Sequence, residues 1–292
     1  MAATTLMTLM TATTARNLLI EQLTPRYGAG EAAAIARIVM EDAFMAHGAR
    51  WTEKDKERYN DILSRLLAGE PVQYVLGQAD FFGLKFKVNP AVLIPRQETE
   101  ELVAWVLEYL KNSQLGKPAV LDVGLGSGCV AISLKKKFPR AQLFGLEKSP
   151  AALAVAVENA RSILGEAGEF EFSEGDILNE ADWEKFSALD VVASNPPYIP
   201  LVQKSWMPEH VLAHEPPFAL FVDDDAPLLF YRAIADFSLK KLNPGGALFF
   251  ECNEFNASQV ADLLHQKGFL NVELRKDLAG AERMVSGKIR PD

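Results

Sequence analysis

The chain has few of the residues from which covalent cross-links and metal sites are built. Its 292 residues include two cysteines, Cys129 and Cys252, and four histidines, and no Cys/His cluster has metal-ligand spacing. Two thiols cannot form the disulfide framework of a small secreted protein. We therefore expect no zinc or other metal site, and the cysteine usage is typical of a protein in a reducing cytoplasm.

Long apolar runs and an excess of basic charge are also missing. No window approaches the roughly 18 apolar residues of a membrane span. Residues 1–14 lack the early positive charge and apolar core of a signal peptide. The formal net charge of −9 argues against non-specific binding to nucleic acid, because the release of counterions from nucleic acid needs a basic protein surface. We expect a monomeric cytoplasmic protein with no membrane contact and no direct DNA partner.

The N-terminal part of the chain has the periodicity of helices. Apolar residues recur at three-to-four spacing over residues 15–68, which predicts a small all-helical domain. Gly28 and Gly30 are expected to separate its first two helices, and Thr52 is expected to start another.

The next segment changes character. Residues 84–88 alternate between apolar and polar side chains and lead into a proline turn, which predicts a β-hairpin. We therefore expect three parts: a helical domain at residues 1–70, a linker with the hairpin at 71–97 and a larger domain at 98–292.

From residue 118 onward, strand patterns alternate with helix patterns. This alternation predicts an α/β domain with a doubly wound sheet that is parallel for most of its width. Residues 275–282 are too few for a crossover helix, so the last two strands should pair antiparallel. The seven expected strands are 119–123, 142–146, 170–172, 189–193, 247–252, 271–274 and 283–286.

One apolar strand stops abruptly at Asn195-Pro196-Pro197-Tyr198. The prolines lack the N–H that a strand ladder needs, so the chain must turn at the carboxyl end of the strand, where open α/β sheets bind ligands. The Asn195 side-chain oxygen and a proline carbonyl could accept the hydrogens of a planar NH2 group while Tyr198 covers its face. The alternative is a stiff proline turn, which Pro-Pro alone favours.

A glycine loop follows the first strand of the α/β domain. Gly124, Gly126 and Gly128 would let backbone amides approach a ligand at a helix N-terminus. A dinucleotide-binding fingerprint needs glycine where this chain has Cys129. With Asp122 two residues ahead, the loop instead resembles that of S-adenosylmethionine-dependent methyltransferases.

Three further residues are candidates for cofactor contacts. Glu147 ends the next strand and could accept both ribose hydroxyl protons, although a solvated strand-end glutamate is the alternative. Asp176 follows the third strand, where enzymes of that class typically contact the adenine amino group, and a turn aspartate is an equally good interpretation. Thr99 lies among acidic residues at a predicted helix start and by itself indicates a helix cap.

Together, five segments resemble the release-factor glutamine methyltransferases, the PrmC or HemK family. The resemblance implies a helical substrate-binding domain joined through a β-hairpin to a Rossmann-like, seven-stranded class I methyltransferase domain. It also implies that S-adenosylmethionine methylates N5 of the glutamine in the Gly-Gly-Gln loop of peptide chain release factors. The segments are Gly69–Tyr74, Ile94–Glu100, Asp122–Cys129, Asn195–Ile199 and Arg275–Gly280.

The resemblance assigns roles to the candidate residues. Asn195 and the Pro196 carbonyl would hold the glutamine NH2 group and Tyr198 would pack on the amide plane, so these three are the expected catalytic residues. Pro197 joins them in substrate binding. The resemblance also implies that Thr99 and Asn195 contact the cofactor.

The chain departs from the family pattern at a few positions. Gln97 stands where the family has proline, Leu125 where it has threonine and Glu147 where it has aspartate. We expect Gln97 to loosen the interdomain loop. Leu125 and Glu147 are expected to preserve the approach of the backbone to the cofactor and the contact with its ribose. Residues 251–254 also lack the usual Glu-Ile-Gly. Two alternatives stay open, a glutamine of a ribosomal protein and, against the acidic charge, an adenine amino group in nucleic acid.

Overall fold

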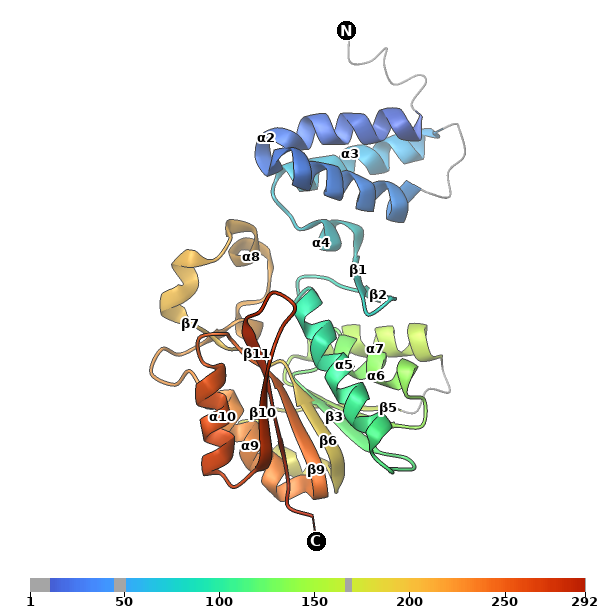
Figure 1. Cartoon of the computed structure of the whole chain (residues 1–292). Helices are drawn as coiled ribbons and strands as arrows, with labels where there is room; N and C mark the ends of the chain where they lie inside the picture. Colours follow the sequence, from blue (N-terminus) through green and yellow to red (C-terminus); the bar gives the residue numbers. More distant parts are fainter. Residues whose placement is uncertain (1–10, 45–50, 166–169, 292) are drawn as a thin grey trace. The chain divides into compact units, whose positions relative to one another are not determined.

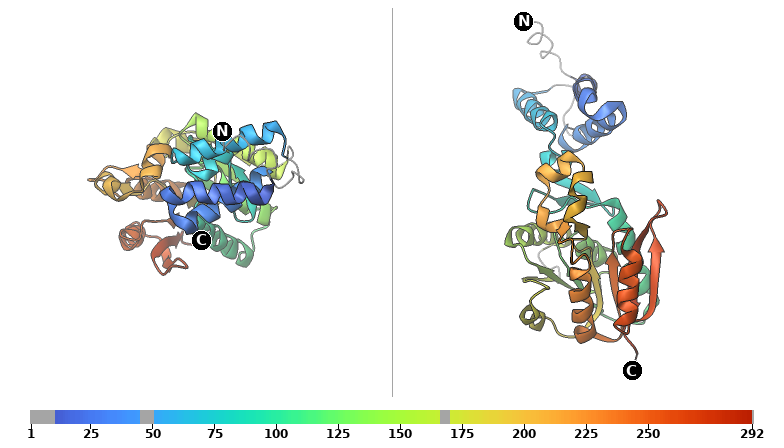
Figure 2. Two further views of the ribbon diagram at one scale, coloured as in Figure 1. Left: turned by 90° about the horizontal axis from the view of Figure 1, so that it is seen from above. Right: turned by 90° about the vertical axis from the view of Figure 1, so that its left-hand side faces the viewer.

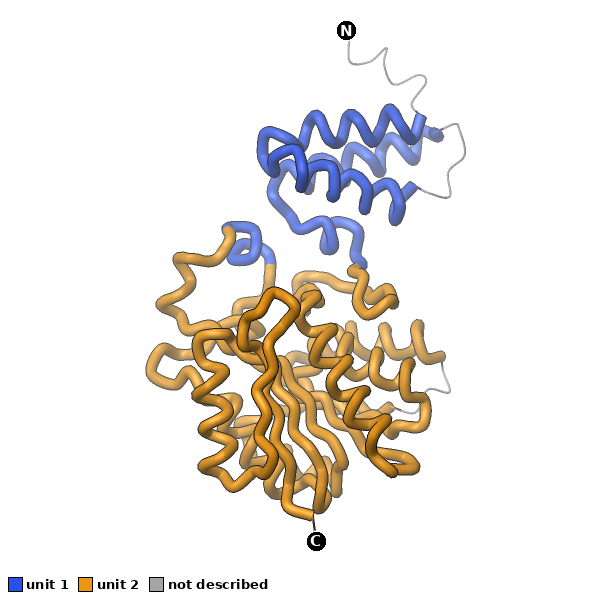
Figure 3. Tube along the Cα trace, in the orientation of Figure 1, with its two compact units in different colours: residues 1–78, 209–214 blue, residues 79–208, 215–292 orange. Residues whose placement is uncertain are grey.

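The protein folds into two compact units, which Figure 3 distinguishes by colour. The structure is a computed structural model that describes residues 11–44, 51–165 and 170–291. One unit comprises residues 1–78 with 209–214, and the other comprises residues 79–208 with 215–292. Among the described residues, no helix combines the length and the apolarity needed to cross a membrane.

Helices build the first unit, as the periodicity predicts. They are α2 (Ala12–Val39), the π-helical turn η2 (Met40–Phe44), α3 (Glu53–Leu67) and α4 (Val72–Leu76). Only Gly28 interrupts α2, because its φ of 76° and ψ of 161° are not helical, whereas Gly30 continues the helix. The buried core of this unit includes Leu19, Leu23, Ala36, Val39, Phe44, Tyr59, Ile62 and Leu66.

A capping box fixes the start of α3 where the sequence predicts it. The Thr52 hydroxyl accepts a hydrogen bond from the Asp55 N–H at 3.2 Å, and the Asp55 carboxylate accepts one from the Thr52 N–H at 2.8 Å. Two backbone donors that the helix itself cannot satisfy are therefore paired.

The second unit contains a seven-stranded sheet in the order β10-β11-β9-β6-β3-β4-β5. All its pairs are parallel except those of β11, which runs antiparallel to β9 and to β10. The predicted seven-stranded α/β sheet and its antiparallel final pair are thus confirmed. The strands are β3 (Ala119–Val123), β4 (Gln142–Glu147), β5 (Phe170–Glu174), β6 (Leu189–Ser194), β9 (Leu242–Glu251), β10 (Leu270–Lys276) and β11 (Glu282–Lys288).

Helices cover both faces of this sheet (Figure 1). One face packs against α5 (Gln97–Asn112), α6 (Cys129–Lys137) and α7 (Pro150–Leu164), and the other against α9 (Leu229–Lys241) and α10 (Ala257–Gln266). Figure 2 shows α10 beside the last two strands, drawn in red. Alternating strand residues serve the two cores, because successive side chains point to opposite faces. Val191, Ala193, Ala247 and Phe249 face one core, and Val192, Leu248 and Phe250 the other.

Shorter elements connect these layers. The expected hairpin consists of β1 (Gln78–Phe81) and β2 (Leu84–Lys87), with positive φ at both turn residues. A small parallel pair between β7 (Ile199–Pro200) and β8 (Phe221–Val222) was not predicted, because two-residue strands leave no periodicity to detect. The remaining short helices are η3 (Glu180–Lys185), η4 (Leu201–Trp206), α8 (Glu209–His214) and η5 (Pro217–Ala219).

We expect Thr52→Ala to weaken α3 by about 1 kcal/mol, because it removes one half of the capping box. Native-state hydrogen exchange should show lower opening free energies for the α3 amides. Ser64→Ala is the matched control, since Ser64 is an exposed residue inside the same helix. Equal protection in the two variants would contradict this role of Thr52.

Candidate active site

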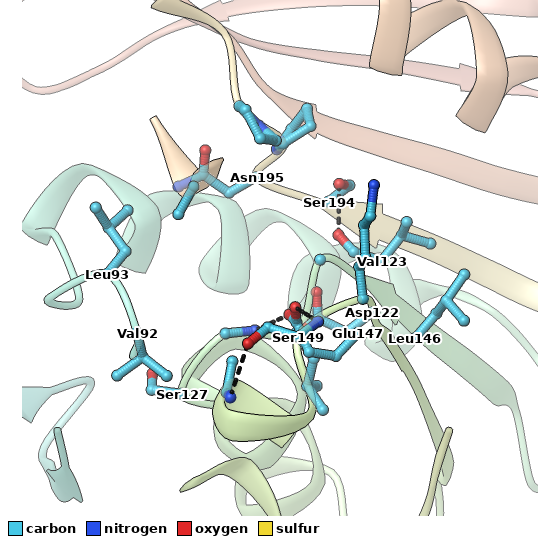
Figure 4. Close-up of a pocket in the computed structure, with 18 of the residues that line it drawn as sticks. Val92, Leu93, Asp122, Val123, Ser127, Leu146, Glu147, Ser149, Ser194 and Asn195 are labelled. Atoms are coloured by element: carbon cyan, nitrogen blue, oxygen red, sulfur yellow. Dashed lines mark hydrogen bonds between the residues drawn. The ribbon is translucent and has the colours of Figure 1, made fainter. Parts of the chain in front are cut away.

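A cavity of about 570 Å³ opens at the carboxyl ends of β3, β4 and β6 in the second unit (Figure 4). The strand order reverses between β3 and β6, and such switch points are where open α/β sheets bind ligands. Most of the residues that the sequence analysis singles out line this cavity. They are Thr99, Asp122, Gly124, Gly126, Glu147, Asp176, Asn195, Pro196 and Pro197.

Gly128 does not line the cavity, although it was expected to contact the cofactor. Its φ is 79°, and a Cβ atom there would lie 2.8 Å from Ile132 Cδ1 and 3.4 Å from Ala156 Cβ. Glycine suits this position because φ is positive and a Cβ atom would touch Ile132 of α6 and Ala156 of α7. The residue therefore contributes to the packing at the start of α6, and its contact with the cofactor stays a prediction.

Tyr198 is the second exception, because it is not among the lining residues. Its ring packs against the core on the α9 side of the sheet, and its hydroxyl donates to Glu251 Oε1 at 3.5 Å. Burial, followed by the Glu251 charge, raises the pKa of the Tyr198 phenol. The phenol therefore stays a neutral donor directed at a buried carboxylate, and the packing of the ring on a substrate amide stays a prediction.

The Glu147 carboxylate ties the glycine loop to the next strand. Gly126 N–H donates to its Oε2 at 2.9 Å, and Ser149 N–H donates to its Oε1 at 2.8 Å, as the dashed lines in Figure 4 show. The side chain is 6% exposed, so the solvated strand-end interpretation is wrong. Each oxygen keeps a lone pair with which it could accept a ligand hydroxyl.

Asp122 places a second buried carboxyl in the cavity wall. Its Oδ2 accepts a hydrogen bond from Ala131 N–H at 3.1 Å, near the start of α6. Burial, reinforced by the nearby Glu147, raises the pKa of Asp122 to about 8. A positively charged ligand group placed beside this carboxyl would favour its ionised form.

Asp176 lies on the cavity wall and also shapes its own turn. Its Oδ1 accepts from Leu178 N–H at 2.9 Å, and its Oδ2 lies 2.8 Å from Lys148 Nζ. The turn interpretation therefore holds, and the residue also lines the cavity.

Thr99 connects Asn195 to a buried carboxylate that sequence reasoning missed. The Thr99 hydroxyl donates to Glu251 Oε2 at 2.6 Å, and Asn195 Nδ2 donates to the Thr99 hydroxyl at 3.2 Å. No side chain caps α5 at its N-cap residue Arg96, so Thr99 does not act as a helix cap.

Strand pairing explains why Asn195 and Glu251 meet. Ser194 is paired with Phe250 in the parallel β6–β9 ladder, so the residues that follow lie at the same edge of the sheet. A single acidic residue that ends an apolar strand was the available sequence signal. This acidic residue indicates a site only when β9 is known to lie beside β6 in the sheet.

Glu251 is almost completely buried, at 1% exposure. Burial raises the pKa of this carboxyl to about 7, while the Thr99 hydrogen bond and the Arg283 charge act in the opposite direction. Arg283 donates to Asp277 at 2.8 Å, so its closest partner is another carboxylate.

A second buried carboxylate, Glu215, was also missed. It accepts hydrogen bonds from Arg96 Nη2 at 2.5 Å and from Ile94 N–H at 3.2 Å. These bonds hold the segment before α5, part of which lines the cavity, against the loop before η5.

The departures from the family pattern have local explanations. Leu125 is buried, and a Cβ atom at Gly145 would lie 2.9 Å from both of its methyl groups. The larger side chain therefore fits because residue 145 has none. Gln97 is the first residue of α5, a position where proline is also favourable.

Two protein-family models match the chain. The Methyltransferase small domain matches residues 103–214, and the PrmC N-terminal domain matches residues 19–77.

Curated relatives and a solved structure extend these matches. The release factor glutamine methyltransferase of Flavobacterium psychrophilum is 42% identical over 234 residues, which is 80% of each chain. That of Bacteroides thetaiotaomicron is 38% identical over 233 residues, covering 80% of this chain and 81% of the relative. The crystal structure of the hMettl16 catalytic domain in complex with MAT2A 3′UTR hairpin 6 has a TM-score of 0.55 at 13% identity, with 83% of this chain and 84% of that chain covered. This last similarity shows the fold alone.

The fold, the cavity and the matches define the class as that of S-adenosylmethionine-dependent methyltransferases with a class I fold. Within this class, the chain belongs to the release factor glutamine methyltransferase family. The resemblance inferred from the five sequence segments is thereby confirmed, as is the methyl donor it implies.

We expect Gly128→Ala to destabilise the cofactor-free protein more than Gly124→Ala. Both residues have positive φ, so each alanine costs about 1 kcal/mol of backbone strain. Only the methyl group at 128 meets other side chains, which adds about 1–3 kcal/mol. Urea unfolding of the two variants measures the difference, and equal midpoints would contradict the packing role of Gly128.

We expect the stability of the Glu251→Gln variant relative to the wild type to increase as the pH rises from 5 to 8.5. The folded-state pKa near 7 lies above the unfolded value of about 4.3, so the wild type loses stability as the carboxyl ionises over this range. Glutamine has no such loss. Thermal unfolding at both pH values measures the effect, with the exposed Glu254→Gln as control. A pH-independent difference between Glu251→Gln and the wild type would refute it.

Proposed function

We propose that this protein transfers the methyl group of S-adenosylmethionine to the side-chain amide nitrogen of the Gly-Gly-Gln glutamine in a peptide chain release factor. The names of the relatives support this substrate. The observation that carries the proposal is the placement of Asn195 and Pro196 in the wall of a cavity that suits the cofactor.

The residues of the cavity match the chemistry of S-adenosylmethionine. Asp122 offers a buried carboxyl to a cationic group, Glu147 has free lone pairs for ribose hydroxyls and Asp176 faces the cavity as a candidate acceptor for the adenine amino group. Gly124 and Gly126 leave room for a ligand to approach the backbone of the loop at these two positions. When bound, the cofactor supplies an electrophilic sulfonium methyl group.

The substrate glutamine needs precise positioning, because delocalisation of its nitrogen lone pair makes an amide a weak nucleophile. Asn195 Oδ1 and the Pro196 carbonyl would each accept one hydrogen of the substrate NH2 group. They would hold the nitrogen in place and stabilise positive charge that develops on it. Positioning by these two oxygens carries the catalysis in this proposal.

The helical N-terminal domain is the proposed docking surface for the release factor. We assign residues 1–70 to substrate binding, 71–97 to the linker and 98–292 to methyl transfer. The match of residues 19–77 to the PrmC N-terminal domain supports the first assignment.

We expect Asn195→Ala to lower turnover at least about 100-fold, because the amide loses one of its two positioning acceptors. Cofactor affinity should stay within about threefold, since the variant retains Asp122, Glu147 and the glycine loop. Single-turnover methyl transfer and calorimetric titration measure the two effects. A comparable loss of cofactor binding would contradict the proposed role of Asn195.

The substrate itself is tested with labelled S-adenosylmethionine. The enzyme is offered a purified release factor, the same factor with alanine in place of its Gly-Gly-Gln glutamine, and bulk nucleic acid. Label should appear on the intact factor alone. Label on nucleic acid instead would overturn the proposed substrate and leave the methyltransferase class intact.

A further inference from the structure

We propose that Thr99 and Glu251 are positioning residues that force the Asn195 amide to present its oxygen to the substrate. This inference rests on the proposed function, in which that oxygen accepts a hydrogen of the substrate NH2 group. It also assigns Thr99 a role other than the cofactor contact that the family resemblance implies.

The Thr99 hydroxyl has a single proton to donate. An ionised carboxylate can only accept hydrogen bonds, so the 2.6 Å contact with Glu251 uses this proton. The Thr99 oxygen is left as an acceptor toward Asn195. At a separation of 3.2 Å it therefore selects the NH2 end of the amide.

The other end of the amide is then available for the substrate. Among the described residues, no hydrogen bond involves Asn195 Oδ1, and the side chain lies in the wall of the cavity. If the amide were reversed, it would present its own NH2 group to the substrate NH2 group. Two donors would face each other, and the substrate would lose a hydrogen bond.

The charge of Glu251 controls this selection. A neutral carboxyl could donate its proton to the Thr99 oxygen, which would free the Thr99 proton to face Asn195. Either orientation of the amide would then find a partner. The burial that holds the pKa of Glu251 near 7 places this transition in the range where the enzyme can be assayed.

The positive charge of Arg283 acts on Glu251, but the ion pair of this arginine in the described structure is with another carboxylate. Arg283 instead lies 2.8 Å from Asp277, while Tyr231 donates to the backbone carbonyl of Glu251 at 3.1 Å. The titratable and charged groups around the carboxyl come from several elements. They are Glu98 on α5, Cys129 on α6, Tyr198 in the loop after β6, Tyr231 on α9, Arg283 on β11 and Cys252 next to it in the chain.

Thr99→Val and Thr99→Ser form the matched pair for the kinetic test. Valine keeps the shape but removes the hydroxyl, and we expect it to lower kcat at least about tenfold with cofactor Kd within about threefold. Serine restores the hydroxyl and should return kcat to within about threefold of the wild type. Equal losses in both variants, or a cofactor affinity that falls as much as kcat, would overturn the proposal.

The pH profile tests the role of Glu251. We expect the wild-type kcat to fall as the pH drops through about 7, because protonation removes the selection of the amide orientation. Glu251→Gln should have a lower kcat without this acid limb, since its side chain does not titrate. An unchanged limb in this variant would exclude Glu251 as its origin.

A measurement on the free protein separates this inference from the proposed function. With 15N-labelled asparagine, the Asn195 side-chain NH2 signal, assigned by its loss in Asn195→Ala, should titrate near pH 7 in the wild type. The titration should vanish in Thr99→Val and in Glu251→Gln. If it persists in either variant the inference fails, even if the release factor is methylated. If it vanishes while no release factor is methylated, only the proposed substrate fails.

Discussion

The site depends on one constraint, the parallel pairing of β6 between β3 and β9. Because parallel strands end at the same edge, this pairing brings together three segments that are far apart in the sequence: the glycine loop, the Asn-Pro-Pro turn and the end of β9. The prolines end the ladder of β6, so Asn195 leaves the sheet at the cavity. A shift of register by one residue would reverse which side chains face each core and would separate Asn195 from Glu251.

Buried carboxylates are the second organising feature. Asp122, Glu147, Glu215 and Glu251 are all less than 10% exposed, and each accepts at least one hydrogen bond from a backbone N–H or a side chain. Burying such groups opposes folding, since desolvation disfavours their charged form. Their concentration around one cavity is typical of a functional site. There, burial of carboxylates lowers the stability of the fold but shifts their pKa values for binding or catalysis.

The sequence was sufficient for the fold because its signals are local and repeated. Apolar runs of strand length, a glycine loop and a strand that ends at proline define the seven strands and the ligand edge. Glu251 and Tyr198 could not be placed in this way. The contact of Glu251 with Thr99 joins residues 152 positions apart, and the direction of the Tyr198 side chain depends on a carboxylate from another strand. The sequence also does not separate the two uses of a glycine such as Gly128, because close packing and ligand approach both favour glycine.

The complementarity of Leu125 and Gly145 makes these two positions epistatic. Leu125 and Phe172 both reach into the space that a side chain on residue 145 would need. A lineage that acquires the leucine at 125 is therefore favoured by the glycine at 145, and one that later replaces this glycine needs room from both Leu125 and Phe172. The order of substitutions in the glycine loop is thus restricted by a neighbouring strand, and a loop transferred from a relative carries this dependence with it.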